Sequence, residues 1–161
     1  EYANASFGQG IALTPIGATR AFSAIANGGN LITPHFVKQI RYENGLSKIP
    51  EYPAVRTGVI KKETSETISR MLVHVFESYD HYSIATKTGT AQVAQENGKG
   101  YYLDRHLHSF FGYFPAYDPK FLVFLFLKNP HEAKYASQTL IPPFVNLTKF
   151  LVNYYVVPPD R

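Results

Sequence analysis

The tetrapeptide Lys87-Thr88-Gly89-Thr90 holds the residues of this chain whose types and spacing best suit chemistry. Lys87 supplies a fixed positive charge. Side chains alternate between the two faces of a strand, so Thr88 and Thr90 point to the same side and can both bond one anion. Gly89 lets a ligand approach the backbone closely. The N–H of Thr90 can stabilise an oxygen on which negative charge develops. The group suits recognition of a carboxylate beside a reacting carbonyl.

The same residues also have an interpretation without a ligand, because a surface lysine beside a tight turn gives this tetrapeptide by chance. The histidines offer a competing site. His106 and His108 lie two residues apart and would share a strand face, as metal ligands can. Only Asp104 lies close to them in the sequence as a further ligand. We therefore interpret both histidines as polar residues at the entry of a strand, and predict no metal and no cofactor.

The composition is that of a folded domain of 161 residues, because 45% of them are hydrophobic and 17% are charged, which excludes a disordered chain. The formal net charge is +4, but lysine and arginine are scattered, so no nucleic-acid-binding stripe is predicted. The absence of cysteine excludes disulfides and thiolate metal sites. The longest apolar run, Phe121 to Leu127, is too short to span a bilayer.

Three helices are predicted around the tetrapeptide. Thr14 is a good N-cap for the first, with Pro15 at its first position and Asn27-Gly28-Gly29 as a left-handed stop. The second begins between Lys61 and Ser65, and the third opens at Pro142-Pro143. The apolar positions that share a face are Ala18, Phe22 and Ile25 in the first helix, Ile68, Met71, Leu72, Val75, Phe76 and Tyr79 in the second, and Phe144, Leu147, Leu151 and Tyr154 in the third.

Four segments are predicted to be extended, namely residues 36–42, 82–90, 108–114 and 120–128. Residues 43–53 form a loop or hairpin, and residues 92–102 a polar surface loop. The segment 120–128 is apolar on both faces, which predicts a central strand covered on both sides. Hairpin-connected strands with helices before and after them predict an α/β chain of the α+β type, with an antiparallel sheet flanked by helices.

Further stretches of the chain carry a resemblance to a known family. They are Ser6-Phe7-Gly8-Gln9-Gly10, Leu13-Thr14-Pro15-Ile16, Ala24 to Gly29, Lys87 to Gln92, Ser109 to Ala116, and Pro142-Pro143-Phe144. In this order they resemble the class B penicillin-binding proteins, which are peptidoglycan transpeptidases, and Lys-Thr-Gly is a signature of penicillin-recognising serine enzymes. The resemblance implies the serine D,D-transpeptidase/β-lactamase-like fold. It predicts that residues 1–161 are the C-terminal portion of a single transpeptidase domain, incomplete at its N-terminal side.

Two other signatures of that family, Ser-x-x-Lys and Ser-x-Asn, are absent from the chain. In the family both precede the Phe-Gly-x-Gly region. Ser47, Ser65, Ser69 and Ser137 all lack a lysine three residues later. We therefore expect the segment alone to be inactive, and the upstream half of the same domain to be its partner.

The resemblance implies a role for each residue of the tetrapeptide. A serine outside this chain attacks the penultimate D-alanine carbonyl of a stem peptide, and an amine of a second stem peptide then takes the acyl group. Lys87 sets the local positive potential and steadies the serine of Ser-x-Asn. Thr88 and Thr90 bind the terminal carboxylate, beside Gly89, and the Thr90 N–H forms half of the oxyanion hole. β-Lactams acylate the same serine because they resemble the D-Ala-D-Ala dipeptide.

By the same resemblance, other cell-wall synthesis proteins are expected partners, and the outer face of the cytoplasmic membrane is the expected location. Two other functions fit the tetrapeptide. One is a non-catalytic module that binds peptidoglycan peptides or β-lactams, and the other is a β-lactamase or β-lactam sensor of the same fold. The Phe-Gly-Gln-Gly and Ser-Phe-Phe-Gly-Tyr-Phe-Pro-Ala stretches favour a transpeptidase over a β-lactamase.

Overall fold

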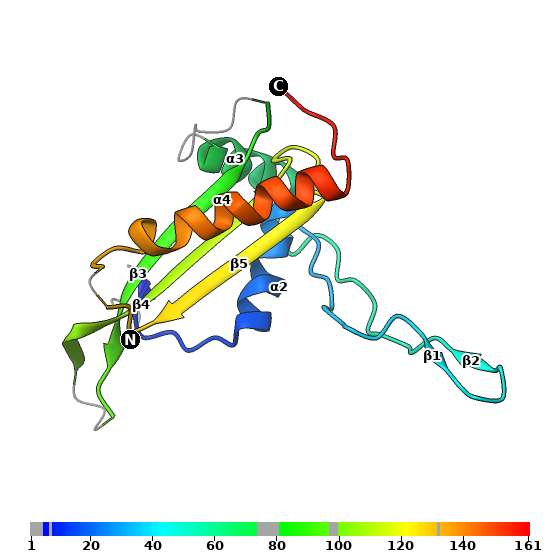
Figure 1. The fold of residues 1–161 in the computed structure, drawn as a ribbon, viewed down its shortest axis with the longest axis horizontal. Coiled ribbons are helices and arrows are strands. Elements are labelled where there is room, and N and C mark those ends of the chain that lie inside the picture. Colours follow the sequence, from blue (N-terminus) through cyan, green and yellow to red (C-terminus); the bar gives the residue numbers. More distant parts are fainter. Residues whose placement is uncertain (1–4, 7, 74–80, 97–99, 132) are drawn as a thin grey trace.

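The computed structural model describes residues 5–6, 8–73, 81–96, 100–131 and 133–161. Its body is an antiparallel sheet between two layers of helices (Figure 1). The strands are β3 (Ala85–Ala94), β4 (Tyr101–Phe114) and β5 (Phe121–Lys128), side by side in that order. Helix α4 (Ala136–Tyr154) covers one face, and α2 (Pro15–Ala26) and α3 (Lys62–Val73) cover the other. The predicted antiparallel sheet flanked by helices is confirmed.

Strand β4 lies at the centre and sends alternate side chains into two separate cores. Phe110 and Phe114 contact Phe144 of α4, with ring centroids 4.7 and 6.4 Å apart. Phe111 lies on the other face and stacks on Phe22 of α2, with centroids 4.1 Å apart. Because each aromatic ring buries a large apolar area, the two cores together fix which face of β4 meets which helices.

The central position predicted for residues 120–128 is wrong for the described sheet. Strand β5 forms one edge of that sheet, and its last apolar residues Phe126 and Leu127 are 52% and 41% exposed. The central strand is β4. The prediction was based on apolar residues on both faces of β5, and that pattern gives no information about which neighbours a strand has.

Helix α2 begins and ends where its local residues predict. The Thr14 side chain accepts a hydrogen bond from the Gly17 N–H at 3.1 Å, and Pro15 is the first helical residue. After the helix, Gly28 and Gly29 take φ values of 77° and 96°, as predicted for the stop. These caps need no partner outside the helix.

Helix α3 starts within the predicted interval, and its buried face agrees with the prediction only in part, since Leu72 packs against the core as predicted. Met71, predicted on the apolar face, is 64% exposed, whereas Ser65 and Ser69 are buried. The Ser69 hydroxyl lies 2.7 Å from the hydroxyl of Tyr113 on β4. Small residues on this face therefore let α3 lie close to the sheet. The predicted apolar positions Val75, Phe76 and Tyr79 lie outside the described residues.

Helix α4 begins at Ala136, so the predicted start at Pro142-Pro143 is wrong. The two prolines lie inside the helix and have no N–H, so two helical hydrogen bonds are missing there. The turn before the prolines is held instead from outside the helix, by hydrogen bonds to Thr90 of β3 and His108 of β4. Among the residues that the structure describes, no helix is both long and apolar enough to cross a membrane.

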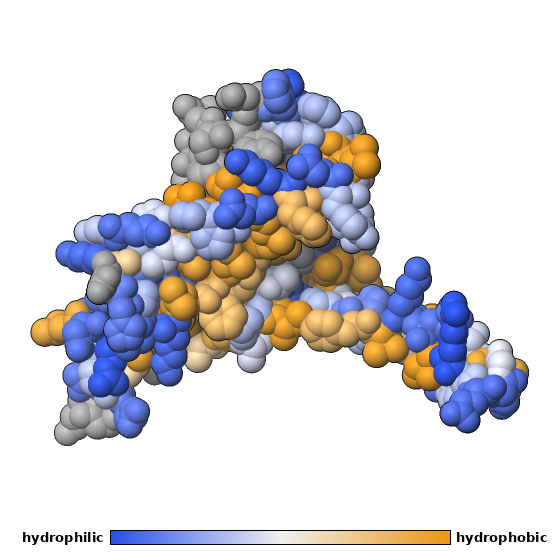
Figure 2. Space-filling model, viewed as in Figure 1, coloured by the Kyte–Doolittle hydropathy of each residue, from blue (hydrophilic) through white to orange (hydrophobic). Residues whose placement is uncertain are grey.

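One predicted loop and one predicted strand have different bounds in the structure. The predicted surface loop 92–102 is shorter at both ends, because β3 continues to Ala94 and β4 begins at Tyr101, with an irregularity in register after Gln92. The predicted strand 36–42 reduces to β1 (Ile40–Arg41), which pairs with β2 (Ser47–Lys48). This ribbon lies in an arm that projects from the body, and apolar residues are visible along it (Figures 1 and 2).

The sheet and α4 approach each other so closely that Gly112 of β4 has no room for a side chain. A Cβ there would lie 2.5 Å from Phe144 Cζ and 3.0 Å from Thr86 Cγ2. We predict that Gly112→Ala lowers the free energy of unfolding by about 1–3 kcal/mol through overpacking. Urea unfolding of a double-mutant cycle with Phe144→Leu measures it, since the smaller residue should relieve the clash. Strict additivity of the two substitutions would contradict this explanation.

Candidate functional site

The tetrapeptide Lys87–Thr90 lies within β3, which forms the second edge of the described sheet. On its inner side, Lys87 pairs with Phe111 and Thr90 pairs with His108. No described strand pairs with its outer side. An edge of this kind can accept an extended peptide as an additional strand, through main-chain hydrogen bonds. The site is therefore a strand edge that is held in position by β4.

The side chains of the tetrapeptide are divided between the two faces of the sheet. Thr88 and Thr90 lie on the face covered by α4, where the Thr90 Oγ1 accepts a hydrogen bond from the Ala136 N–H at 3.0 Å. Lys87 and Gly89 lie on the face covered by α2 and α3. A ligand that runs along the edge between the two faces can contact the lysine on one side and the hydroxyls on the other.

Lys87 brings a positive charge to this edge. Its side chain is exposed, and the Nζ donates a hydrogen bond to the carbonyl oxygen of Thr88 at 2.7 Å. Within the described ranges, no carboxylate forms an ion pair with Lys87. The charge therefore remains available to an anionic ligand, and the bond to its own strand keeps the ammonium close to the backbone edge.

Packing within the fold requires glycine at position 89, in addition to the close approach of a ligand that the sequence predicted. It pairs with Ser109 of β4, and a Cβ at Gly89 would lie 2.5 Å from the Ser109 Oγ. The Ser109 hydroxyl is directed at the Gly89 carbonyl oxygen, 3.4 Å away. The sequence did not reveal this contact, because it depends on the register between the two strands.

His108 is the neighbouring residue that sequence reasoning placed wrongly. It was interpreted as a polar residue at a strand entry, but it is fully buried and faces α4. The signal that could have revealed this is the spacing on β4, since His108, Phe110 and Phe114 fall on the same face of the strand. His106 lies next to it, with ring centroids 6.4 Å apart. The described residues contain no group of three side chains that could hold a metal ion.

A concavity of about 360 Å³ lies over the sheet next to the tetrapeptide. It is lined by residues 8–12, by residues 91–94 of β3, by Tyr101 and Leu107 of β4, and by Lys128 of β5. The Gly8-Gln9-Gly10 segment and the Ala91-Gln92 pair, which are far apart in the sequence, therefore line one groove. Because its lining reaches from β3 across β4 to β5, this groove lies over a face of the sheet next to Thr90, and not along the open edge of β3.

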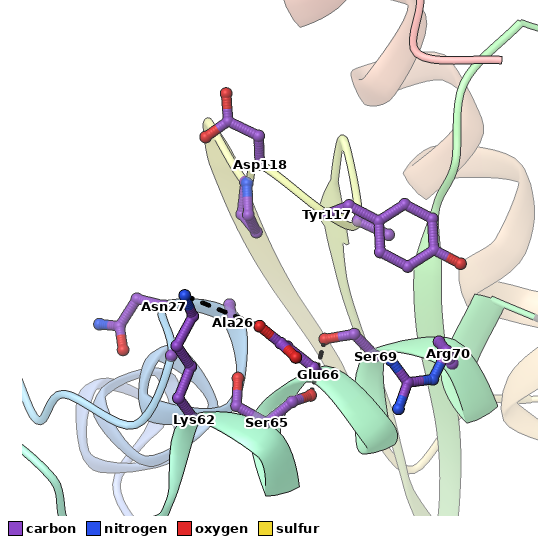
Figure 3. A pocket seen from close by; sticks show the side chains of 12 residues that line it. Ala26, Asn27, Lys62, Ser65, Glu66, Ser69, Arg70, Tyr117 and Asp118 are labelled. Carbon is purple, nitrogen blue, oxygen red and sulfur yellow. Dashed lines mark hydrogen bonds and ion pairs between the residues drawn. The ribbon is translucent and has the colours of Figure 1, made fainter.

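A larger cavity, of about 490 Å³, lies elsewhere and is shown in Figure 3. It is bounded by the end of α2, by α3 and by the turn after β4, and no residue of the tetrapeptide lines it. Its charged groups already have partners, since Lys62 pairs with Glu66 at 3.8 Å and Asp118 pairs with Lys120 at 2.7 Å, and Arg70 donates a hydrogen bond to the Thr67 hydroxyl at 3.0 Å. We therefore assign the candidate site to the edge of β3, in spite of the smaller volume there.

The chain is similar to known proteins over almost its whole length. The family described as the penicillin binding protein transpeptidase domain matches residues 1–146. Stage V sporulation protein D of Bacillus subtilis (strain 168) is 34% identical over 154 residues, which are 90% of this chain and 23% of that protein. A peptidoglycan D,D-transpeptidase FtsI homolog of Mesostigma viride is 28% identical over 99% of this chain and 30% of that protein. The chain thus spans less than a third of these relatives.

Solved structures agree with this similarity. Penicillin binding protein 3 from Mycobacterium tuberculosis, in its apo form, matches 99% of this chain and 39% of its own, with a TM-score of 0.87 and 26% identity. Its complexes with aztreonam and ampicillin match with TM-scores of 0.86 and 0.87. A peptidoglycan synthetase from Bifidobacterium adolescentis covers 96% of this chain and 29% of its own, with a TM-score of 0.79 and 27% identity.

The contact between Gly89 and Ser109 gives a test of the register at the site. We predict that Gly89→Ala lowers the free energy of unfolding by about 1–3 kcal/mol, because the new methyl group meets the Ser109 Oγ. Adding Ser109→Ala should restore most of that loss, since the next-nearest atom, Ser109 Cβ, lies 3.9 Å away. Urea unfolding of Gly89→Ala, of Ser109→Ala and of the double variant decides the matter, and a double variant as unstable as Gly89→Ala would exclude this pairing as the cause.

Tyr113 gives a test of the contact between β4 and α3. Burial raises the pKa of its hydroxyl above the ordinary 10.0, although the hydrogen bond with Ser69 lowers it. Below about pH 10 both the folded and the unfolded state hold the proton. Above it the unfolded state loses the proton first, so stability should fall as the pH rises towards the folded pKa. Urea unfolding near pH 8 and pH 11 should show a smaller fall for Tyr113→Phe, but not for the exposed control Tyr154→Phe.

Proposed function

This chain belongs to the penicillin-binding protein transpeptidase family, and from that premise we propose that residues 1–161 are the C-terminal portion of one transpeptidase domain in a longer protein. The domain crosslinks peptidoglycan stem peptides through an acyl-serine intermediate. The observation that carries the proposal is the tetrapeptide at an unpaired strand edge, with Lys87 on one face and Thr88 and Thr90 on the other. The length of the relatives supports the larger domain.

In this proposal the D-Ala-D-Ala end of a stem peptide lies along the outer edge of β3. The hydroxyls of Thr88 and Thr90 donate to the terminal carboxylate, and Lys87 adds a positive potential. The penultimate carbonyl then faces the N–H of Thr90, which with a second donor outside this chain stabilises the oxyanion. Gly89 leaves the backbone accessible to the ligand at this point.

The covalent steps belong to a serine in the upstream part of the domain. Its Oγ attacks the penultimate carbonyl, the peptide bond to the last D-alanine breaks, and the serine proton ends on the departing amine. The amine of a second stem peptide then attacks the acyl-serine and forms the crosslink, and its proton returns to the serine. β-Lactams such as ampicillin enter the first step and stop there, because their ring opens without losing a leaving fragment. The segment alone has no nucleophile for these steps.

Exposed apolar residues support the upstream part of the domain as a partner of this chain. Ile11, Leu13 and Ile16, around the start of α2, are 58%, 65% and 47% exposed. Strand β5 is apolar on both faces and has a free edge in the described sheet. Exposed apolar surface of this kind favours aggregation, so we propose that the upstream segment covers it. A location on the outer face of the cytoplasmic membrane, with other cell-wall synthesis proteins as partners, belongs to the same proposal.

The test compares the whole protein with residues 1–161 alone, each incubated with ampicillin and examined by intact mass. We expect the whole protein to gain the mass of one ampicillin molecule and the segment to gain none. Thr88→Val and Thr90→Val in the whole protein should each slow acylation about tenfold, the factor for one hydrogen bond to a charged group. Thr148→Val, on a buried threonine of α4, is the matched control.

The other functions predict different results in the same experiment. Rapid release of hydrolysed ampicillin would indicate a β-lactamase. Saturable binding of ampicillin without an increase in mass would indicate a non-catalytic module. A separate assay, in which the protein crosslinks a stem pentapeptide to an acceptor amine, would exclude that module. An adduct on the segment alone would show that its nucleophile lies within residues 1–161, contrary to the proposal.

A further inference from the structure

His108 is a buried polar residue that the proposed chemistry leaves without a role. Its side chain is 0% exposed, and it lies on β4 directly opposite Thr90. Buried polar groups need hydrogen-bond partners, and the ring has two. Nδ1 lies 2.9 Å from the hydroxyl oxygen of Thr139, and Nε2 lies 3.2 Å from the carbonyl oxygen of Lys134. One partner precedes α4 and the other lies in its first turn, so the ring spans the start of this helix.

The chemistry of the two partners determines how the ring is bonded. A carbonyl oxygen only accepts, so Nε2 carries a hydrogen and donates it to Lys134. In the neutral ring Nδ1 is then an acceptor, and the Thr139 hydroxyl donates to it. If Nδ1 is also protonated, it donates to Thr139, whose own proton turns to the carbonyl oxygen of Ala136, 3.3 Å away. His108 therefore keeps both contacts in either ionisation state.

The first turn of α4 depends on such contacts from outside. Pro142 and Pro143 cannot donate the helical hydrogen bonds that would tie this turn to the next one. The side chain of Gln138 accepts from the N–H groups of Lys134 and Tyr135, each at 3.1 Å, which organises the turn locally. Only His108 and Thr90, among the described residues of the sheet, are hydrogen bonded to it from β4 and β3.

The same turn determines how the Thr90 hydroxyl is used. The Ala136 N–H occupies a lone pair of Thr90 Oγ1, so the hydroxyl proton is directed to another acceptor. Amides at the start of a helix carry partial positive charge, and a hydroxyl that accepts from one becomes a stronger donor. We propose that His108 is a positioning residue: it fastens the first turn of α4 to the sheet, and that turn holds Thr90 as a donor to the ligand carboxylate. This rests on the proposed function of Thr90.

The experiment uses the whole protein and two ligands, ampicillin and its methyl ester, which lacks the negative charge. Thr139→Val removes the hydroxyl bonded to His108 with little change of shape, and Thr139→Ser keeps it. His108→Leu removes both contacts of the ring. Thr148→Val is the control, because the Thr148 hydroxyl is buried on the same helix and has no hydrogen-bond partner among the described residues.

We expect Thr139→Val and His108→Leu to lower the acylation efficiency with ampicillin roughly tenfold, and to leave that with the ester nearly unchanged. Thr139→Ser and Thr148→Val should keep the parent ratio of the two efficiencies. A merely structural role would lower both efficiencies together. An equal fall with both ligands, or an unchanged ratio in Thr139→Val, would overturn the proposal.

Hydrogen–deuterium exchange of residues 134–141 provides a readout that does not need acylation. Thr139→Val should speed exchange there at least several-fold, because the Ala136 amide loses its fixed position against Thr90. If the parent protein is not acylated by either compound, the proposed function fails. The exchange rate alone then tests whether His108 positions the first turn of α4 against Thr90. Exchange as slow in Thr139→Val as in Thr148→Val would then overturn it.

Discussion

The antiparallel register between β3 and β4 is the constraint on which the rest of this structure depends. It sets Lys87 opposite Phe111, Gly89 opposite Ser109 and Thr90 opposite His108. Because side chains alternate along a strand, a slip by one residue would move every side chain of the tetrapeptide to the other face. The aromatic residues of β4 prevent such a slip, since Phe110 is buried against α4 and Phe111 against α2. The core is thus what orients the site.

The open edge of β3 is a second constraint, because it exposes unpaired backbone groups. An unpaired edge can pair with another chain, so natural edges usually carry charges or irregularities that prevent this. Lys87 places a charge on β3, and the register changes after Gln92. In the proposed function the charge also suits a ligand, because it attracts the anionic end of a stem peptide. In that proposal, the charge that protects the edge from pairing with another chain also selects the ligand that binds there.

The parts of the fold that the sequence predicted correctly are those with local causes. Helix α2 has its cap at Thr14 and its stop at Gly28 and Gly29, and each acts within a few residues. The start of α4 was predicted wrongly because the turn before Pro142 is held by Thr90 and His108, which no local rule includes. For the same reason the tetrapeptide was recognised from its residue types, whereas the tie between Thr90 and α4 and the burial of His108 became visible only with the register.

Lys87 and Thr90 are held in the structure to different degrees, and the reason is that a charge interaction and a hydrogen bond depend differently on geometry. The energy between charges falls slowly with separation, so a lysine can act from an exposed side chain whose exact position varies. A hydrogen bond weakens steeply once its donor angle falls below about 120°, so a hydroxyl must be held in one orientation. The structure agrees with this difference. The ammonium of Lys87 is hydrogen bonded to its own strand, whereas the Thr90 hydroxyl is hydrogen bonded to α4 and Thr90 lies opposite a buried histidine. In the proposed function, the Thr90 hydroxyl therefore supplies the geometric precision of the site, and Lys87 supplies a positive potential.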